Sequence, residues 1–344
     1  MKSTLLKYYF SFIFICIATI AYGQDIHFSQ MFETPLLRNP ALAGLFAGDV
    51  RTQMVYRSQW NTITDAYNTA SANMEYKIPV GESSDFLTIG GQLLYDKAGT
   101  VALTSTHVLP AINYHKSLNG EKSMYLSMGL MGGWVQRSID RSKITTNSQF
   151  DGSNYNASLG NGESFSKSSY SYFDGTAGMS LNGQIGENTD NNYFVGLAYH
   201  HFNKSKKISF YSDAAVEMQP KWVASGGIRM STNDFAFITF EADYSKQATH
   251  TEIIGGLLYT MKLDDPIDAK YLIHAGAYMR FNDAIIPVVK VEAKPLAIAV
   301  SYDVNISGLK QASKGRGGFE ISLVYQKYID KYNSSRDATR CPKF

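Results

Sequence analysis

Apolar and polar residues alternate along most of the chain that follows residue 48. Between residues 50 and 60, the large apolar side chains mostly occupy even positions, and charged or amide side chains occupy odd ones. The apolar set is Val50, Met54, Tyr56 and Trp60, and the polar set is Arg51, Gln53, Arg57 and Gln59. Near the C terminus, Phe319, Ile321 and Leu323 alternate with Glu320 and Ser322. Because successive side chains of a strand point to opposite faces, these runs predict β-strands with one apolar and one polar face.

About fourteen such runs follow one another, with no convincing helix between them. They cover residues 49–60, 66–78, 86–96, 103–115, 122–137, 170–183, 192–202, 220–231, 234–245, 250–262, 270–282, 284–293, 295–305 and 316–328. An even strand number is typical of bacterial outer-membrane barrels, and about 9–11 residues suffice to cross a bilayer. Soluble sandwiches use shorter strands and more frequent turns. The pattern predicts an all-β fold, a transmembrane antiparallel β-barrel of the outer membrane over residues 49–329.

Tyrosine is the most frequent aromatic residue, with 23 copies. Many tyrosines close a predicted strand, among them Tyr56, Tyr76, Tyr95, Tyr114 and Tyr325. A phenol ring at a strand end suits the headgroup zone of a membrane, so we interpret these residues as an aromatic girdle. The alternative is that tyrosine is simply a good strand former.

The two ends of the chain carry other signals. A basic start at Lys2 and Lys7, an apolar run over residues 8–20 and a small residue at Gly23 predict a signal peptide over residues 1–23, removed after Gly23. Cys341 is then the one cysteine left, which excludes an internal disulfide. Residues 330–344 are predicted to form a periplasmic tail. Cys341, Pro342 and Phe344 in this tail are candidate contacts for a periplasmic partner, unless the tail is a frayed terminus.

The longest segment without strand pattern covers residues 138–169 and is rich in Ser, Asn and Gly. Barrels keep their periplasmic turns short and their long loops outside the cell, so we expect this loop to be extracellular. Residues 203–219 form a second, shorter candidate. Phe150, Tyr155 and Phe165 supply aromatic side chains among adaptable polar residues, a composition that suits a protein-binding surface. These three residues are the predicted contacts for a secreted cargo.

The sequence contains no motif of a known enzyme class. There is no nucleophile elbow, no H-E-x-x-H zinc motif and no phosphate loop. His200 and His201 are adjacent, so on a strand they would point to opposite faces and could not grip one metal ion. A formal net charge of +2 argues against a nucleic-acid partner. We therefore predict a protein that is not an enzyme, with no cofactor and no metal site.

Residues 24–48 have neither strand nor helix periodicity, although the stretch is partly apolar. Such a segment cannot lie in lipid, because its backbone groups would have no hydrogen-bond partners. We expect it on the periplasmic side, as a plug in the lumen or across the periplasmic mouth. Phe28, Met31, Phe32 and Leu36 would pack inside the barrel, Asn39 and Pro40 would make a turn, and Gly44 and Gly48 would let the chain bend into the first strand. A plain periplasmic tether is the alternative.

Several segments together resemble the PorP/SprF family of type IX secretion system membrane proteins. They are "HFSQMFETPLLRNPALAG" from residue 27, "YRSQW" from residue 56, "SYDVNISGL" from residue 301, "GGFEISLVY" from residue 317 and the terminal "CPKF". The residues that carry the motifs are Phe28, Ser29, Gln30, Asn39, Pro40, Gly44, Tyr56, Arg57, Gln59 and Trp60. The matches fall in order at both ends, so the resemblance spans the whole mature chain.

The resemblance implies an outer-membrane barrel that assists secretion or surface attachment of cargo. Such cargo includes large adhesins with a C-terminal sorting domain, used in gliding and adhesion. Adhesin cargo is implied by the SprF-like branch of the family. The PorP-like branch implies periplasmic partners, from the type IX secretion machinery or the peptidoglycan-binding class, and the sequence leaves both branches open. Outer-membrane lipid is a partner in either case. Fatty-acid-transporter barrels are the alternative, because they have about fourteen strands and an N-terminal hatch similar to "RNPALAG". The polar lumen faces predicted here suit water or protein better than fatty acid.

The last predicted strand also carries a pattern for membrane insertion. Assembly of outer-membrane barrels reads a polar residue, a glycine two positions later, and two large apolar residues at alternate positions. Arg316, Gly318, Ile321 and Leu323 fit this pattern. Terminal Phe344 would then not be part of the insertion signal.

Overall fold

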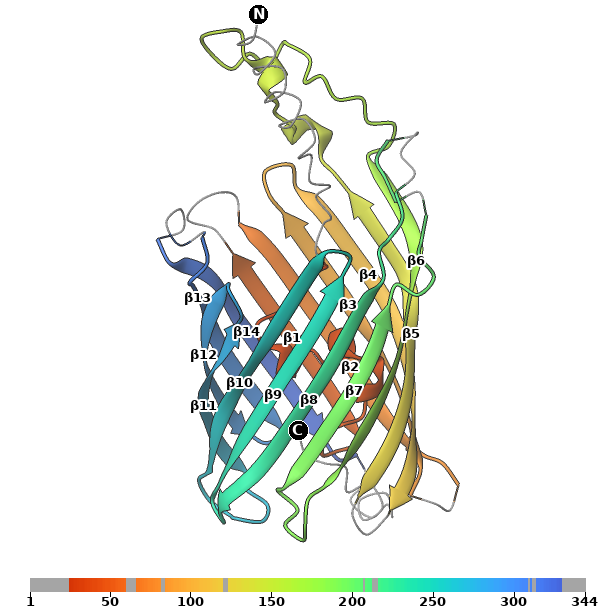
Figure 1. Cartoon of the computed structure of the whole chain (residues 1–344), viewed down its shortest axis with the longest axis vertical. Coiled ribbons are helices and arrows are strands. Elements are labelled where there is room, and N and C mark those ends of the chain that lie inside the picture. Colours follow the sequence, from red (N-terminus) through yellow and green to blue (C-terminus); the bar gives the residue numbers. More distant parts are fainter. Residues whose placement is uncertain are drawn as a thin grey trace, which may run out of the picture.

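The computed structural model describes residues 25–59, 66–81, 84–119, 123–206, 208–211, 216–308, 310 and 314–329. Within these residues, fourteen strands form one closed barrel (Figure 1). The strands are β1 (Val50–Gln59), β2 (Tyr67–Pro79), β3 (Phe86–Ala98), β4 (Leu103–Asn119), β5 (Met124–Ser138), β6 (Ser169–Gln184), β7 (Asn192–His200), β8 (Lys221–Asn233), β9 (Ala236–Gln247), β10 (His250–Lys262), β11 (Tyr271–Arg280), β12 (Ala284–Ala293), β13 (Leu296–Asn305) and β14 (Arg316–Lys327).

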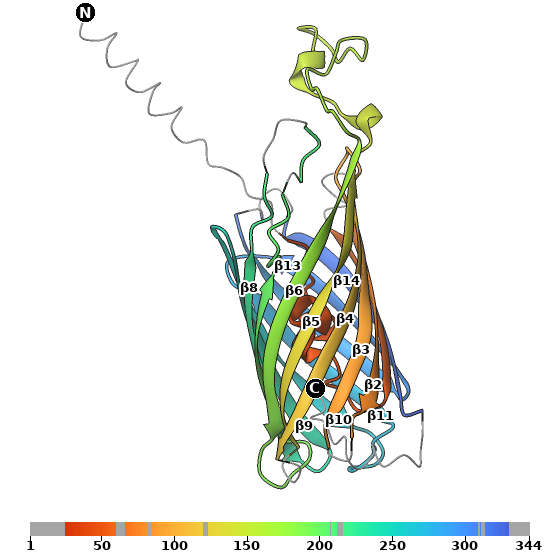
Figure 2. The ribbon, with the colours of Figure 1, turned by 90° about the vertical axis from the view of Figure 1, so that its right-hand side faces the viewer.

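Every strand pairs antiparallel with its neighbours in sequence, and β14 pairs with β1 to close the barrel. In this closing seam Met54 lies opposite Leu323, and Arg57 lies opposite Glu320. Figure 2 shows the strands tilted around a lumen that contains part of the chain. The predicted runs coincide with the fourteen strands apart from small differences at their ends. The prediction of an antiparallel outer-membrane barrel is confirmed.

The two faces of the wall differ as the alternation predicts. Met54, Leu93 and Leu323 project from the outer wall and are exposed, whereas Gln53 and Glu320, at positions of the opposite parity, are buried in the interior. An outer face of this kind suits the hydrocarbon of a bilayer, where the closed ladder also leaves no unpaired strand edge. None of the helices in the described ranges is long and apolar enough to cross a membrane.

The connections between strands differ at the two ends of the barrel. One end, the loop end, carries the long connections 139–168 and 201–220, and the opposite end, the turn end, carries connections as short as 234–235 and 294–295. Strand β1 starts at the turn end, beside the last residue of β14. The loop end is the one that the sequence predicts to face the outside of the cell.

Candidate functional site

The N-terminal segment, residues 25–49, runs lengthwise through the barrel lumen. It contains the short helices η1 (Met31–Glu33), α2 (Pro35–Arg38) and η2 (Pro40–Leu42), and its ribbon lies inside the ring of strands in Figure 2. Asp25 donates its backbone N–H to the Gln247 side chain at the loop end, and the Asp49 N–H bonds the carbonyl of Lys327 at the turn end. The segment therefore spans the lumen. The sequence predicted a plug in the lumen or across the periplasmic mouth, and it did not predict that the segment reaches the loop end.

Turn-forming residues give the segment its compact path. Pro35 and Pro40 each occupy the first position of a helix, where a missing N–H costs nothing. The Asn39 side chain caps η2 by accepting the Ala41 N–H at 2.8 Å. Gly44 and Gly48 have φ of 84° and 136°, which other residues rarely adopt, and they redirect the chain toward β1.

The apolar side chains of the segment pack against small apolar clusters on the lumen wall. Phe28 contacts Val55 and Leu94, and Leu36 belongs to a cluster formed mainly by β4, β5 and β6. Met31 lies in a cluster with Ile254 and Ile286, and the Phe32 ring stacks on Tyr278 with centroids 5.4 Å apart. All four aromatic or aliphatic residues predicted to pack inside the barrel lie there, which supports a plug as the role of this segment.

A buried charge cluster, which we call the Arg57 cluster, holds the first part of the segment. It consists of Arg57, Asp303, Glu320 and Arg280. The Glu320 carboxylate accepts the backbone N–H groups of Ser29 at 2.7 Å and Gln30 at 2.8 Å. Arg57 contacts both acids, at 3.0 Å from Asp303 and 3.2 Å from Glu320, and donates to the His27 carbonyl at 2.7 Å. Strands β1, β13 and β14 are thereby joined to the segment by hydrogen bonds to charged groups, the strong kind.

A second charged contact holds the middle of the segment. Arg38, at the end of α2, donates to both carboxylate oxygens of Asp243 at 2.8 Å and to Glu241 at 2.6 Å. This two-pronged geometry matches the guanidinium fork to a carboxylate. Glu33, in η1, pairs with Lys290 at 2.8 Å. Arg38 and Glu33 thus each have a partner of opposite sign on the wall, as burial requires.

Three glycines of the wall form a floor for the Asn39–Pro40 turn, and we call them the glycine floor. A methyl group added at Gly129 would lie 2.5 Å from the Pro40 backbone, and one at Gly178 would lie 1.9 Å from the Asn39 side-chain oxygen. At Gly196 it would lie 2.7 Å from the Asn39 nitrogen. Gly129 and Gly178 are paired across β5 and β6. The turn of the N-P-A-x-A-G motif therefore fits against strands that carry no side chain at the contact.

The glycine floor gives a direct test of the fitted segment. Gly129→Ala should lower the free energy of unfolding by about 1–3 kcal/mol, because overpacking forces the backbone of Pro40 or of β5 to move. Protease should also cut the N-terminal segment faster in the variant than in the parent. Gly226→Ala is the control, because its methyl group would meet only the Phe194 carbonyl at 3.6 Å, an ordinary contact. Equal stability of the two variants would show that the turn is not fitted to the floor.

At the turn end, basic residues and Phe46 hold the last part of the segment. Gly44 donates its N–H to Glu75 at 2.7 Å, and Glu75 in turn accepts from Arg51 at 2.8 Å. The Arg51 guanidinium and the Lys77 ammonium lie 4.6 Å and 4.3 Å from the centroid of the Phe46 ring. Cations over an aromatic face attract it, so Phe46 stays inside the mouth of the barrel.

The two adjacent histidines do not point to opposite faces, contrary to the prediction. Strand β7 ends at His200, and His201 has a φ of 58°, which turns the backbone so that both rings are buried. His200 contacts the Arg38 carbonyl at 3.1 Å, while His201 contacts Asp174 at 2.8 Å and Asp25 at 3.4 Å. Among the described residues, no group of three or more His, Cys, Asp or Glu side chains could hold a metal ion.

The loop over residues 138–169 rises from the barrel as a protrusion with two short helices, η3 (Arg141–Lys143) and η4 (Asn147–Gln149) (Figure 2). Phe150 and Tyr155 are bridged to each other and are 58% and 56% exposed. The Asp151 carboxylate accepts the N–H groups of Asn154 and Ser153, and these bonds hold its pKa below the usual value. The tip is thus an ordered hairpin that presents two aromatic rings.

The loop between β7 and β8 packs against the protrusion. Its Tyr211 contacts Phe165, one of the predicted cargo contacts. The rings of Phe165 and Tyr211 lie 4.9 Å apart, and Phe210 accepts the backbone N–H groups of Ser166 and Lys167. Phe165 therefore braces the two loops together, while Phe150 and Tyr155 project outward. The sequence did not predict the contact of Phe165 with Tyr211, because nothing in it pairs residues 46 positions apart.

The remaining predicted residues lie at several places in the barrel. Tyr56 projects from the outer wall, and Gln59 ends β1 opposite Gly318, which leaves room for the stems of Gln59 and Arg57. Arg316 starts β14, and Ile321 and Leu323 face outward. Trp60, Cys341, Pro342, Phe344 and the cleavage position after Gly23 lie outside the described residues. Sequence reasoning missed Asp303, Glu320, Glu241 and Asp243, although an acid on the lumen parity of a strand was an available signal.

The chain is similar in sequence to one protein family and in structure to several solved proteins. The sequence model of a family described as "Type IX secretion system membrane protein PorP/SprF" matches residues 20–325. No curated protein matches the chain. Among solved structures, the chain is similar to the toluene transporter TbuX of Ralstonia pickettii, with 10% identity and a TM-score of 0.47 over 87% of this chain and 94% of that one. A FadL homologue of Pseudomonas aeruginosa has 9% identity and a TM-score of 0.47 over 86% and 94%. The translocator domain of the Neisseria meningitidis autotransporter NalP has 11% identity and a TM-score of 0.40 over 87% and 96%.

Proposed function

Since the chain belongs to the PorP/SprF family of type IX secretion system membrane proteins, we propose that it assists the secretion or surface attachment of cargo proteins. The cargo class is a large adhesin with a C-terminal sorting domain, of the kind used in gliding and adhesion. The family and the fold are those of an outer-membrane barrel of secretion, not of a known enzyme.

The observation that carries the proposal is the filled lumen. Buried hydrogen bonds hold the N-terminal segment to the wall at three places. Ser29 donates to Glu320, Arg38 donates to Asp243, and Gly44 donates to Glu75. A polypeptide could pass through this barrel only after these charged contacts separate. We therefore propose that cargo crosses the membrane through a separate translocon, and that this barrel contacts it from the loop end.

The tip of the protrusion is the proposed cargo contact. Aromatic side chains in exposed, ordered loops are frequent hot spots of protein interfaces, because they bury a large area at a low entropic cost. Phe150 and Tyr155 fit this description, and Phe165 supports them through Tyr211. Loops on a rigid barrel can vary in recognition without disturbing the fold.

Further proposals concern the ends of the chain. The signal peptide is removed after Gly23, and residues 330–344 extend into the periplasm. There Cys341, Pro342 and Phe344 contact a partner from the secretion machinery or the peptidoglycan-binding class. Arg316, Gly318, Ile321 and Leu323 serve as the insertion signal read during assembly of the barrel.

A transporter for hydrophobic small molecules is the second function that the fold allows. It is not favoured, because the family match points to secretion and the lumen is crossed by charged groups such as Arg38, Arg57 and Glu320. An apolar solute would have to leave water for a path lined by charges, which is unfavourable.

Deletion of the gene separates the two functions. The secretion function predicts that surface-attached adhesin, measured by immunolabelling of whole cells, falls to background and returns on complementation. Growth on long-chain fatty acid or on aromatic hydrocarbon as carbon source should be unchanged. Normal adhesin display together with impaired uptake would instead establish the transporter function.

A further inference from the structure

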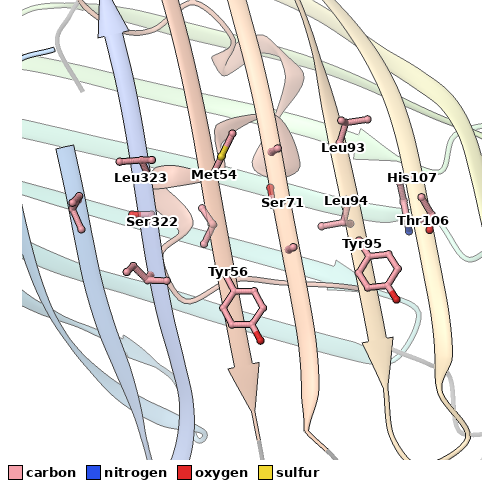
Figure 3. A pocket seen from close by; sticks show the side chains of 15 residues that line it. Met54, Tyr56, Ser71, Leu93, Leu94, Tyr95, Thr106, His107, Ser322 and Leu323 are labelled. Atoms are coloured by element: carbon pink, nitrogen blue, oxygen red, sulfur yellow. The ribbon is translucent and has the colours of Figure 1, made fainter. Parts of the chain in front are cut away.

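The outer wall beside the closing seam carries an apolar trough. Two small residues of β2, Ala70 and Ala72, lie between larger side chains of β1 and β3. In the ladder, Ala72 is flanked by Met54 and Leu93, and Ala70 is flanked by Tyr56 and Tyr95. Figure 3 shows Met54, Tyr56, Leu93 and Tyr95 on neighbouring strands. The hollow that these residues and the two alanines line has a volume of about 610 Å³. The trough is therefore a hollow in the face of the barrel that meets lipid.

A polar pocket lies directly beyond the trough, toward the loop end. It has a volume of about 580 Å³ and shares Tyr95 with the trough. Lys97, Thr104 and Ser138 form the next row of outward side chains, since Lys97 pairs with Thr104 and Thr104 pairs with Ser138. Two residues along a strand are roughly 6.6 Å, so this row lies one step beyond Tyr95. Arg141, in η3, completes the basic side of the pocket.

The basic and acidic residues of this pocket differ in their ion pairing. Among the described residues, no ion pair is formed by Lys97 or Arg141, whereas the acid of the pocket, Asp140, pairs with Lys143 and accepts the N–H of Ser142. An anion that enters the pocket would thus meet two unpaired cations. The tyrosines of the outer wall are the rings suited to the headgroup zone, so Tyr95 places these cations at headgroup level.

From this arrangement we propose a binding site for a phosphate-bearing lipid on the outer wall. The acyl chains lie in the trough over Ala70 and Ala72, and the phosphate lies between Lys97 and Arg141. Charge complementarity at headgroup level, with an apolar hollow one row away, selects a lipid over a soluble anion or a second protein. The site is independent of the secretion function proposed above.

The pocket also lies at the base of the protrusion, which gives the lipid a structural role. Ser138, Ile139 and Ser168 line it, and the Ile139 N–H bonds the Ser168 carbonyl at 2.9 Å where the two arms of the loop meet. Asp140 donates its N–H to Val101 in the β3–β4 connection at 3.2 Å. A bound headgroup would brace these backbones and so fix the direction in which the protrusion leaves the membrane.

Native mass spectrometry of the full-length protein in detergent tests the site. The probes are dioleoyl phosphatidic acid, dioleoylglycerol with the same acyl chains but no phosphate, and inorganic phosphate. The parent should retain phosphatidic acid well above the other two probes. The double variant Lys97→Gln/Arg141→Gln should bind phosphatidic acid at least ~10-fold more weakly, since each basic residue near an anionic lipid surface contributes about fivefold. Ala70→Leu/Ala72→Leu, which fills the trough with apolar groups, should weaken it as well.

Lys143→Gln is the matched control, because Lys143 lies in the same helix η3 but is paired with Asp140 and does not line the pocket. Heat-modifiable gel mobility confirms that every variant forms the barrel. Equal retention of phosphatidic acid and dioleoylglycerol would overturn the proposal, because the acyl chains alone would then account for the binding. Undiminished binding in Lys97→Gln/Arg141→Gln, or an equal loss in Lys143→Gln, would also overturn it. Binding of inorganic phosphate as tight as that of the lipid would assign the pocket to a free anion.

Discussion

Replacing Glu320 with alanine should lower the free energy of unfolding of the barrel by about 3–5 kcal/mol, the range for removing one partner of a buried ion pair. Glu320 is fully buried and accepts the backbone N–H groups of Ser29 and Gln30 besides contacting Arg57. Its removal leaves two backbone donors without that acceptor and removes one of the two acids that balance Arg57. Thermal or urea denaturation, followed by heat-modifiable gel mobility, measures the change.

Two further variants make this result specific. Glu320→Gln keeps one acceptor oxygen and should lose less stability than Glu320→Ala. Glu217→Ala is the matched control, because Glu217 pairs with Lys206 on an exposed loop and an exposed pair contributes only about 0–1 kcal/mol. Glu320→Ala should also make residues 25–49 accessible to protease. A variant as stable and as protected as Glu217→Ala would show that the Arg57 cluster does not hold the segment.

The strands could be predicted from the sequence because a barrel wall imposes one simple rule at each position. A residue of β1 or β14 faces either lipid or lumen, and a shift by one residue would expose every charge to hydrocarbon. The face of Met54 and Gln53, or of Leu323 and Glu320, can therefore be predicted from the neighbouring residues of the same strand alone. Strand ends were less well predicted. Alternation placed His200 and His201 on opposite faces, but the left-handed backbone conformation of His201 ends the alternation at that residue.

The contacts inside the lumen could not be predicted because they join residues far apart in sequence. Nothing in the stretch around Ser29 indicates that its partner is Glu320, and nothing around Arg38 indicates Asp243. Alternation assigns these acids to the lumen, but only the closed ladder brings β9 and β14 to particular parts of the segment. The glycine floor was likewise hidden, because glycines in a strand also mark bulges or weak packing.

The same limit applies to the path of the N-terminal segment. Its irregular composition excluded lipid and favoured the lumen, and the turn residues Asn39 and Pro40 lie at a turn. The sequence gives no direction for the segment, however, and Asp25 lies at the loop end near His201 rather than beside the start of β1. If the loop end faces outward, as we expect, Asp25 lies on the side of the cell surface, and the segment returns to the periplasmic mouth before β1.

Excision of the tip of the protrusion should reduce surface-attached adhesin at least ~10-fold, because loss of aromatic hot spots typically weakens an interface by about 2 kcal/mol or more. Residues 147–160 can be removed without disturbing the base, since the Thr146 hydroxyl bonds the Asn161 carbonyl at 2.5 Å and brings the two ends together. A short Gly-Ser link then closes the gap. Phe165 remains on Tyr211, and the Ile139–Ser168 bond remains at the base.

Whole-cell immunolabelling of the adhesin measures the effect of this excision, with the amount of heat-modifiable barrel as the internal reference. Phe150→Ser/Tyr155→Ser should reproduce most of the loss, because these exposed rings are the proposed contacts. Lys206→Gln is the control, since Lys206 is exposed on the neighbouring loop and pairs only with exposed Glu217 among the described ion pairs. Full adhesin display in the excised variant, at normal barrel level, would exclude the tip as the contact. In that case the cargo would have to bind other loops of the same end, and a gene deletion that also leaves display intact would exclude the secretion function itself.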